Sequence, residues 1–76
     1  MNKLLQKFTR KYIKHHIKKC TPGQIHKFKR LYSASDLGLD INIIIDNIDE
    51  QKLDHAMFLV MKTNDTNKKL NGVNDE

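Results

Sequence analysis

A single proline limits what the first half of this chain can fold into. Residues 21–24 read Thr-Pro-Gly-Gln, in which Thr21 can cap a helix, Pro22 suits the first helical position and Gln24 completes a capping box. The residue before a proline resists the α conformation, so any helix that precedes this signal must end near Cys20. The sequence therefore predicts two helices instead of one long one, at about residues 2–19 and 22–34.

Hydrophobic periodicity supports both helices. At about 100° per residue, one broad arc of the first helix collects its apolar side chains and one histidine: Met1, Leu4, Leu5, Phe8, Tyr12, Ile13, His16 and Ile17. A narrow arc on the opposite side collects its cations: Lys3, Lys7, Arg10, Lys11, Lys14 and Lys18. The apolar stripe of the second helix consists of Ile25, Phe28, Leu31 and Tyr32. Each helix is amphipathic and is expected to bury its apolar side.

The second half of the chain contains weaker signals. Residues 35–39 read as a connector in which Gly38 adopts the left-handed conformation. Asp40 can cap the apolar segment 41–48, whose isoleucines also have high strand propensity. A lone strand would have no pairing partner in a helical chain, which favours helix, although strand stays open.

A last helix is predicted over residues 50–63, with Asp49 as its cap. One face of this helix carries Leu53, Ala56, Met57, Val60 and Met61. Residues 64–76 are rich in Asn and nearly devoid of large apolar side chains, which predicts a disordered tail.

These elements predict an all-α fold, a small bundle of three to four helices with a long basic N-terminal helix and a disordered C-terminal tail. Residues 1–63 would form a single helical domain. Most of its interior is expected from Leu5, Phe8, Tyr12, Ile25, Phe28, Leu31, Ile44, Leu53, Met57 and Val60. A chain of 76 residues buries only about 60% of its unfolded surface. One cysteine excludes an intrachain disulfide, so the thin core favours a homo-oligomer or a larger partner.

Charge is distributed unevenly along the chain. Residues 1–32 carry ten Lys or Arg and no acidic residue, a formal +10, whereas residues 33–76 carry nine acidic residues against four lysines, a formal −5. This asymmetry points to an anionic partner for the first half. Cations in a row along a helix match the phosphates along a nucleic-acid backbone. The predicted polyanion-binding residues are Lys3, Lys7, Arg10, Lys11, Lys14, Lys18, Lys27 and Arg30.

Three other interpretations of these cations stay open. In the first, the cations form a solvated face whose sole role is to keep a small protein in solution. They can also dock on the acidic second half of the chain, within one protomer or between protomers. Finally, the first helix has the cationic and apolar sides of a helix that lies on an anionic membrane. The core competes for that apolar side, so membrane binding is not expected.

Aromatic side chains and the last helix carry further predictions. The rings of the first two helices fall on apolar stripes and are assigned to the core instead of to base stacking: Phe8, Tyr12, Phe28 and Tyr32. Phe58 and Leu59 lie off the main stripe of the last helix and are predicted to form an exposed protein contact. The chain shows no convincing recognition helix, zinc-finger spacing or glycine-rich phosphate loop.

Metal binding and catalysis are not expected. His15, His16, Cys20 and His26 offer ligand atoms, and two of them are four residues apart, but a closed zinc site needs four ligands and usually has paired short spacings. His55 has no evident Ser or Cys with which to form a nucleophile–base pair. We therefore predict a non-enzymatic protein without a cofactor.

Several short runs between residues 21 and 63 carry a resemblance to a known group of proteins. They are Gln24-Ile25, residues 28–33, Asp36-Leu37, residues 40–42, residues 45–47 and residues 52–57. Through them the chain resembles short, mostly uncharacterised accessory proteins of tailed bacteriophages. That group tends to have Trp where this chain has His55, and Gln-Val-Glu at residues 58–60. The resemblance brings no established activity, but it implies a virus-encoded protein in a bacterial cytoplasm, where such proteins often block or sequester a host component.

The leading functional prediction is a phage-type binding module whose basic N-terminal helix engages nucleic acid, a nucleotide signal or an acidic host-protein surface. The rival prediction is a protein inhibitor of a host enzyme or defence factor that acts through an apolar contact on the last helix. No apolar stretch approaches the roughly 20 residues of a membrane span, and cations recur through Lys19 where a secretory signal would be apolar. A location in the bacterial host cytoplasm is therefore expected.

Overall fold

The computed structural model describes residues 2–33 and 38–75. Within that range the chain forms, in order, α1 (Lys3–Ile17), α2 (Pro22–Tyr32), α3 (Ile41–Asp46), a short 3-10 helix η1 (Glu50–Lys52) and α4 (Leu53–Asp75). The described residues contain no strand, so the predicted all-α bundle is confirmed. The apolar segment for which strand stayed open is helical in its first six residues.

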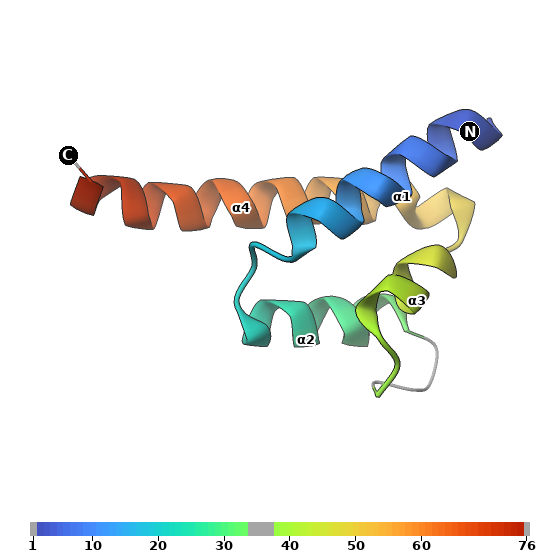
Figure 1. Cartoon of the computed structure of the whole chain (residues 1–76), viewed down its shortest axis with the longest axis horizontal. Helices are drawn as coiled ribbons and strands as arrows, with labels where there is room; N and C mark the ends of the chain where they lie inside the picture. Colours follow the sequence, from blue (N-terminus) through green and yellow to red (C-terminus); the bar gives the residue numbers. More distant parts are fainter. Residues whose placement is uncertain (1, 34–37, 76) are drawn as a thin grey trace.

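Figure 1 shows how the helices are arranged in space. α1 and α4 cross while running in the same general direction, and α2 runs back in the opposite direction. α3 contacts both α1 and α2. The Cα atoms span only 15 Å in the shortest direction, which leaves room for two layers of helices packed about 8–10 Å apart. A bundle this thin covers few side chains on all sides.

The predicted start of α2 is confirmed in detail. Thr21 Oγ1 accepts a hydrogen bond from the Gln24 backbone N–H at 3.2 Å, and the Gln24 side-chain oxygen accepts one from the Thr21 N–H at 2.9 Å. Two of the N–H groups left unpaired by a helix start are thereby satisfied. α2 ends at Tyr32, about two residues before the predicted end, and the connector residues 35–37 lie outside the described residues.

Two local predictions in the second half are wrong. Asp40 and Asp49 precede α3 and η1 as expected, but neither side chain makes a capping hydrogen bond. The left-handed conformation predicted for Gly38 depends on residue 37, which lies outside the described residues. α3 instead receives its polar support from α1 at its other end, as described below.

The core lies where α1, α2, α3 and α4 meet. It consists of Ile13, Ile17, Cys20, Phe28, Ile44, Ile45, Ile48, Leu53, Ala56 and Val60. Burial is thus confirmed for four predicted core residues: Phe28, Ile44, Leu53 and Val60. Three more are partly buried, namely Tyr12, Ile25 and Met57. Leu5, Phe8 and Leu31 were predicted to be buried, and this is wrong, because they are 53%, 59% and 55% exposed.

The apolar arc of α1 drifts around the helix axis, which explains the exposure of Phe8. Side chains four residues apart advance by about 40° around a helix. Ile13 and Ile17 therefore lie about 140–180° from Phe8, although all of them belong to the one broad arc of the sequence. The core covers the side of Ile13 and Ile17, which leaves Phe8 at the surface. Leu5 lies only about 80° from Ile13 around the axis, but it lies near the N-terminal end of α1.

The predicted end of the last helix at Thr63 is also wrong. α4 continues to Asp75, so residues 64–70 are helical and not a disordered tail. Asn64 Nδ2 donates to the His16 carbonyl at 3.2 Å, and Asn67 exchanges hydrogen bonds of 2.9 and 3.0 Å with the Gln24 side chain. Polar contacts, not apolar burial, attach this part of α4.

Candidate functional site

The exposed side of α1 carries four lysines, here called the lysine row: Lys3, Lys7, Lys11 and Lys18. At about 100° per residue, the last three lie within about 40° of one another, over about 16 Å of helix length. α1 contains no acidic residue. The row therefore presents an extended positive charge to solvent.

Arg10 was predicted to belong to this surface, but the structure gives it an internal role. Its guanidinium donates to the carbonyl oxygens of Ile45 and Ile48, the second at 2.9 Å. These carbonyls lie at the C-terminal end of α3, where helix carbonyls lack intrahelical partners and a positive charge is favoured. Arg10 lies only about 20° from Ile17 around α1, which places it at the edge of the buried side.

Lys14 is engaged in the same region. Its Nζ lies 2.6 Å from a carboxylate oxygen of Asp46, the last residue of α3. Part of the basic helix thus docks on the acidic second half within one protomer, which is one of the interpretations that the sequence left open.

Exposed apolar side chains lie beside the lysine row. Leu4 and Phe8 are 62% and 59% exposed, and Phe8 lies about 60° from Lys11 around the helix. The sequence had assigned Phe8 to the core, so it missed a ring at the surface next to cations. An exposed ring beside a cationic track is the combination used to bind single-stranded nucleic acids, whose bases stack on aromatic side chains.

Lys27 and Arg30 lie apart from the lysine row. Both are exposed on α2, which buries Phe28 on a different side. α1 and α2 are separate helices that contribute Ile13 and Phe28 to the shared core (Figure 1). The eight predicted polyanion-binding residues therefore do not form one surface.

The two residues of the predicted protein contact on α4, Phe58 and Leu59, differ in exposure. Phe58 is 60% exposed, and Lys62 Nζ lies 5.5 Å from the centroid of its ring. Leu59, in contrast, is partly buried and packs against the core. Met61 is 43% exposed. An apolar contact on α4 would therefore centre on Phe58 and Met61.

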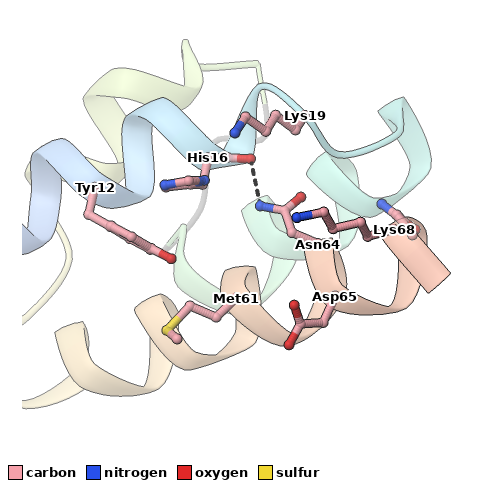
Figure 2. A pocket seen from close by; sticks show the side chains of 8 residues that line it. Tyr12, His16, Lys19, Met61, Asn64, Asp65 and Lys68 are labelled. Atoms are coloured by element: carbon pink, nitrogen blue, oxygen red, sulfur yellow. Dashed lines mark hydrogen bonds between the residues drawn. The ribbon is translucent and has the colours of Figure 1, made fainter. Parts of the chain in front are cut away.

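A cleft of about 370 Å³ lies between the C-terminal part of α1 and the middle of α4. Figure 2 shows its walls, which are formed by Tyr12, His16, Lys19, Met61, Asn64, Asp65, Asn67 and Lys68. Four of these residues lie in the segment predicted to be a tail, so sequence reasoning missed this site. One signal was available: Asn64 and Asn67 continue the spacing of the buried face of α4.

His16 and Cys20 differ from free side chains in their titration. Partial burial, aided by the charges of Lys19 and His15, lowers the pKa of His16, which favours the neutral imidazole. Burial raises the pKa of the Cys20 thiol, and its Sγ lies 3.6 Å from the Asn64 side-chain oxygen. Within the described part of the chain, no three His, Cys, Asp or Glu side chains are grouped to hold a metal ion.

No protein-family model, curated protein or solved structure matches this chain. Among the described residues, no helix combines the length and the apolar character needed to cross a membrane.

Proposed function

We propose that this protein is a non-enzymatic binding module whose α1 binds single-stranded nucleic acid. One observation carries this proposal: an exposed row of lysines and an exposed phenylalanine ring lie next to each other on a single helix. Phosphates would contact Lys7, Lys11 and Lys18, and a base would stack on Phe8. The resemblance to phage accessory proteins supports a role inside a bacterial host cell.

The chemistry of the lysine row sets the expected character of this binding. Ammonium groups that contact phosphates position a nucleic acid but do not read its bases. Stacking on a ring is likewise tolerant of sequence, because every base has an aromatic face. We expect little sequence preference and an affinity that falls steeply with salt.

The test is a titration of fluorescent single-stranded RNA and DNA at two salt concentrations. Lys7→Glu/Lys11→Glu should weaken binding at both salt concentrations, and the slope of log affinity against log salt should become shallower by about 1.4. Lys62→Glu/Lys69→Glu makes the same change in net charge on exposed positions of α4 and serves as the matched control. Phe8→Ala should weaken binding by about 1–3 kcal/mol.

Two results would reject the proposal. One is the absence of binding by the unmodified protein at low salt. The other is equal loss of binding in the two double variants, since net charge alone would then explain the interaction. Arg10 and Lys14 are left unchanged in the test because they hold α3.

A second candidate function is inhibition of a host protein through α4. The exposure of Phe58 and Met61 favours it, since large apolar side chains at a surface often mark protein contacts. Such a contact would keep its affinity as salt rises, whereas phosphate contacts would not. Phe58→Ala should abolish capture of a host protein while leaving nucleic-acid binding intact.

Self-association is the third element of the proposal. Leu4 and Leu5 are uncovered apolar side chains on α1, and a second copy is one means of covering them. Light scattering at tens of micromolar protein tests this element directly. A monomer mass at moderate salt would exclude it without affecting the binding proposal.

A further inference from the structure

The cleft between α1 and α4 lies on a different side of α1 from the lysine row. Tyr12 and His16 lie about 120–160° from Lys18 around the helix, and the remaining wall comes from α4 (Figure 2). The cleft and the lysine row can therefore be changed independently of each other.

One end of the cleft is suited to a flat ring. The rings of Tyr12 and His16 lie with their centroids 4.1 Å apart, and Met61 faces them from α4 (Figure 2). Because its pKa is lowered, His16 presents a neutral imidazole near neutral pH. Aromatic faces and a polarisable thioether together form a favourable slot for a planar aromatic ligand.

The other end is suited to an anion. Lys19, two residues after the end of α1, and Lys68 from α4 both line the cleft, and Lys68 points into it (Figure 2). Both side chains are exposed, so their ammonium groups can approach a ligand from two sides. Asp65 lines the same space and offers a carboxylate that can accept hydrogen bonds from hydroxyl groups.

Hydrogen bonds within the protein connect the helices that form the walls of the cleft. Asn64 is bonded to the His16 carbonyl at 3.2 Å, and Asn67 is bonded to Gln24 at 2.9 and 3.0 Å. These bonds join α4 to α1 and to α2, so the backbone walls of the cleft are connected without a ligand. A volume of about 370 Å³ falls within the usual range for small-ligand sites, roughly 300–1,000 Å³.

We infer that this cleft binds a nucleoside phosphate, with the base against Tyr12, His16 and Met61 and the phosphate between Lys19 and Lys68. Asp65 would accept hydrogen bonds from the sugar hydroxyls. The same chemistry is presented by a free nucleotide and by the 5′-phosphorylated end of a nucleic acid.

The experiment is a series of NMR titrations of the ¹⁵N-labelled full chain with AMP, adenosine and inorganic phosphate. AMP should shift the signals of Tyr12, His16 and Met61 and should bind at least about tenfold more tightly than adenosine or phosphate alone, because only AMP engages both ends of the cleft. Phosphate that binds as tightly as AMP would overturn the inference. So would shifts confined to the lysine row.

The second part of the experiment compares two double variants with the same change in charge, one inside the cleft and one outside it. Lys19→Glu/Lys68→Glu should weaken AMP binding by about tenfold or more, whereas Lys62→Glu/Lys69→Glu, with the same change in charge outside the cleft, should change it by less than about twofold. Unchanged AMP binding by the cleft variant would contradict the inference. If circular dichroism shows that this variant does not fold, the neutral pair Lys19→Gln/Lys68→Gln carries the same comparison.

A third arm identifies the source of the ligand and separates the two sites. In the Lys7→Glu/Lys11→Glu variant, which lacks the lysine row, tighter binding of a 5′-phosphorylated oligonucleotide than of AMP would identify a nucleic-acid end, and equal or tighter binding of AMP would identify a free nucleotide. Lys7→Glu/Lys11→Glu should keep the AMP response while losing the unphosphorylated oligonucleotide. Loss of AMP binding in that variant would place the nucleotide on the lysine row and contradict the cleft site.

Discussion

The two halves of α1 differ sharply although the sequence presents them as one amphipathic helix. Ile13 and Ile17, in the C-terminal half, are 0% and 2% exposed, whereas Leu4 and Phe8, in the N-terminal half, are 62% and 59% exposed. The cations differ by side of the helix, since Lys7 and Lys11 are exposed and Arg10 binds the end of α3. A helix can thus join the core with one half and present both apolar and charged groups to solvent with the other.

The largest effect should come from truncating matched apolar residues in the two halves. Ile13→Ala should lower the free energy of unfolding by about 2–5 kcal/mol, because it leaves a cavity in the core. Leu5→Ala, at a half-exposed site, should cost less than about 1 kcal/mol. Denaturant unfolding of both variants measures the difference. Equal costs would mean that the N-terminal half is covered in solution, for example by a second copy.

Arg10 and Lys11 provide the next comparison, between adjacent cations on different sides of α1. Arg10→Ala should destabilise the protein by about 1.5–3 kcal/mol, since it removes charge-assisted hydrogen bonds to two carbonyl groups. Lys11→Ala should change stability by no more than about 0.5 kcal/mol. Thermal unfolding followed by circular dichroism is sufficient. A mild Arg10 variant would show that α3 does not depend on α1.

A substitution of Asn64 tests how the part of α4 beyond Thr63 holds the C-terminal half of α1. Asn64→Ala should cost about 1 kcal/mol, because the His16 carbonyl loses its side-chain donor. Asp65→Ala, at the neighbouring exposed position, is the control and should be nearly neutral. Hydrogen exchange of residues 64–70 provides a second readout. Rapid exchange of these amides in the unmodified protein would indicate that residues 64–70 are disordered, as the sequence predicted.

The ion pair between Lys14 and Asp46 should contribute less. Both side chains remain partly exposed, at 33% and 54%, so solvent screens their attraction. A double-mutant cycle with Lys14→Ala and Asp46→Ala should give a coupling energy of about 0.2–1 kcal/mol that decreases with salt. A coupling energy that does not change with salt would contradict a solvent-screened pair.

His16 gives a pH-dependent version of the comparison. The pKa of His16 is lowered in the folded protein by partial burial and by the charges of Lys19 and His15. At and below about pH 6.5, His16 therefore binds more protons in the unfolded chain than in the folded protein. The free energy of unfolding should therefore decline as the pH falls through that range and should not change on this account at higher pH. His16→Gln should reduce the decline, which denaturant unfolding at a series of pH values measures.

Residues close together in the sequence were read correctly more often than residues far apart. The capping box at Thr21 was predictable because it depends on neighbours within a few positions, and the helical segment 41–46 was predictable because a lone strand would have no partner in a helical chain. The burial of Phe28 followed from its stripe. The error at Phe8 arose because the apolar arc of α1 is wider than the area that its neighbours cover.

The candidate sites show the same division. The exposed lysines of α1 were found from their periodicity alone, whereas the surface position of Phe8 and the cleft required the fold. The cleft needed Asn64 and Lys68 to be recognised as helical, and Asn-rich sequence gave no apolar signal for that. The buried face of α4 continues beyond residue 63 with asparagines, whose side chains attach it through hydrogen bonds. A search for periodic apolar residues does not detect such a face.

The sequence by itself determined the helical class, the break at residues 21–24 and the concentration of cations on α1, because proline geometry, capping and periodicity act over a few residues. Only the tertiary structure decided which half of α1 joins the core, that Arg10 serves α3, and how α4 meets α1. These outcomes depend on contacts between residues 35 to 48 positions apart. Such contacts are fixed by how the helices cross, and several crossings are compatible with the same local pattern.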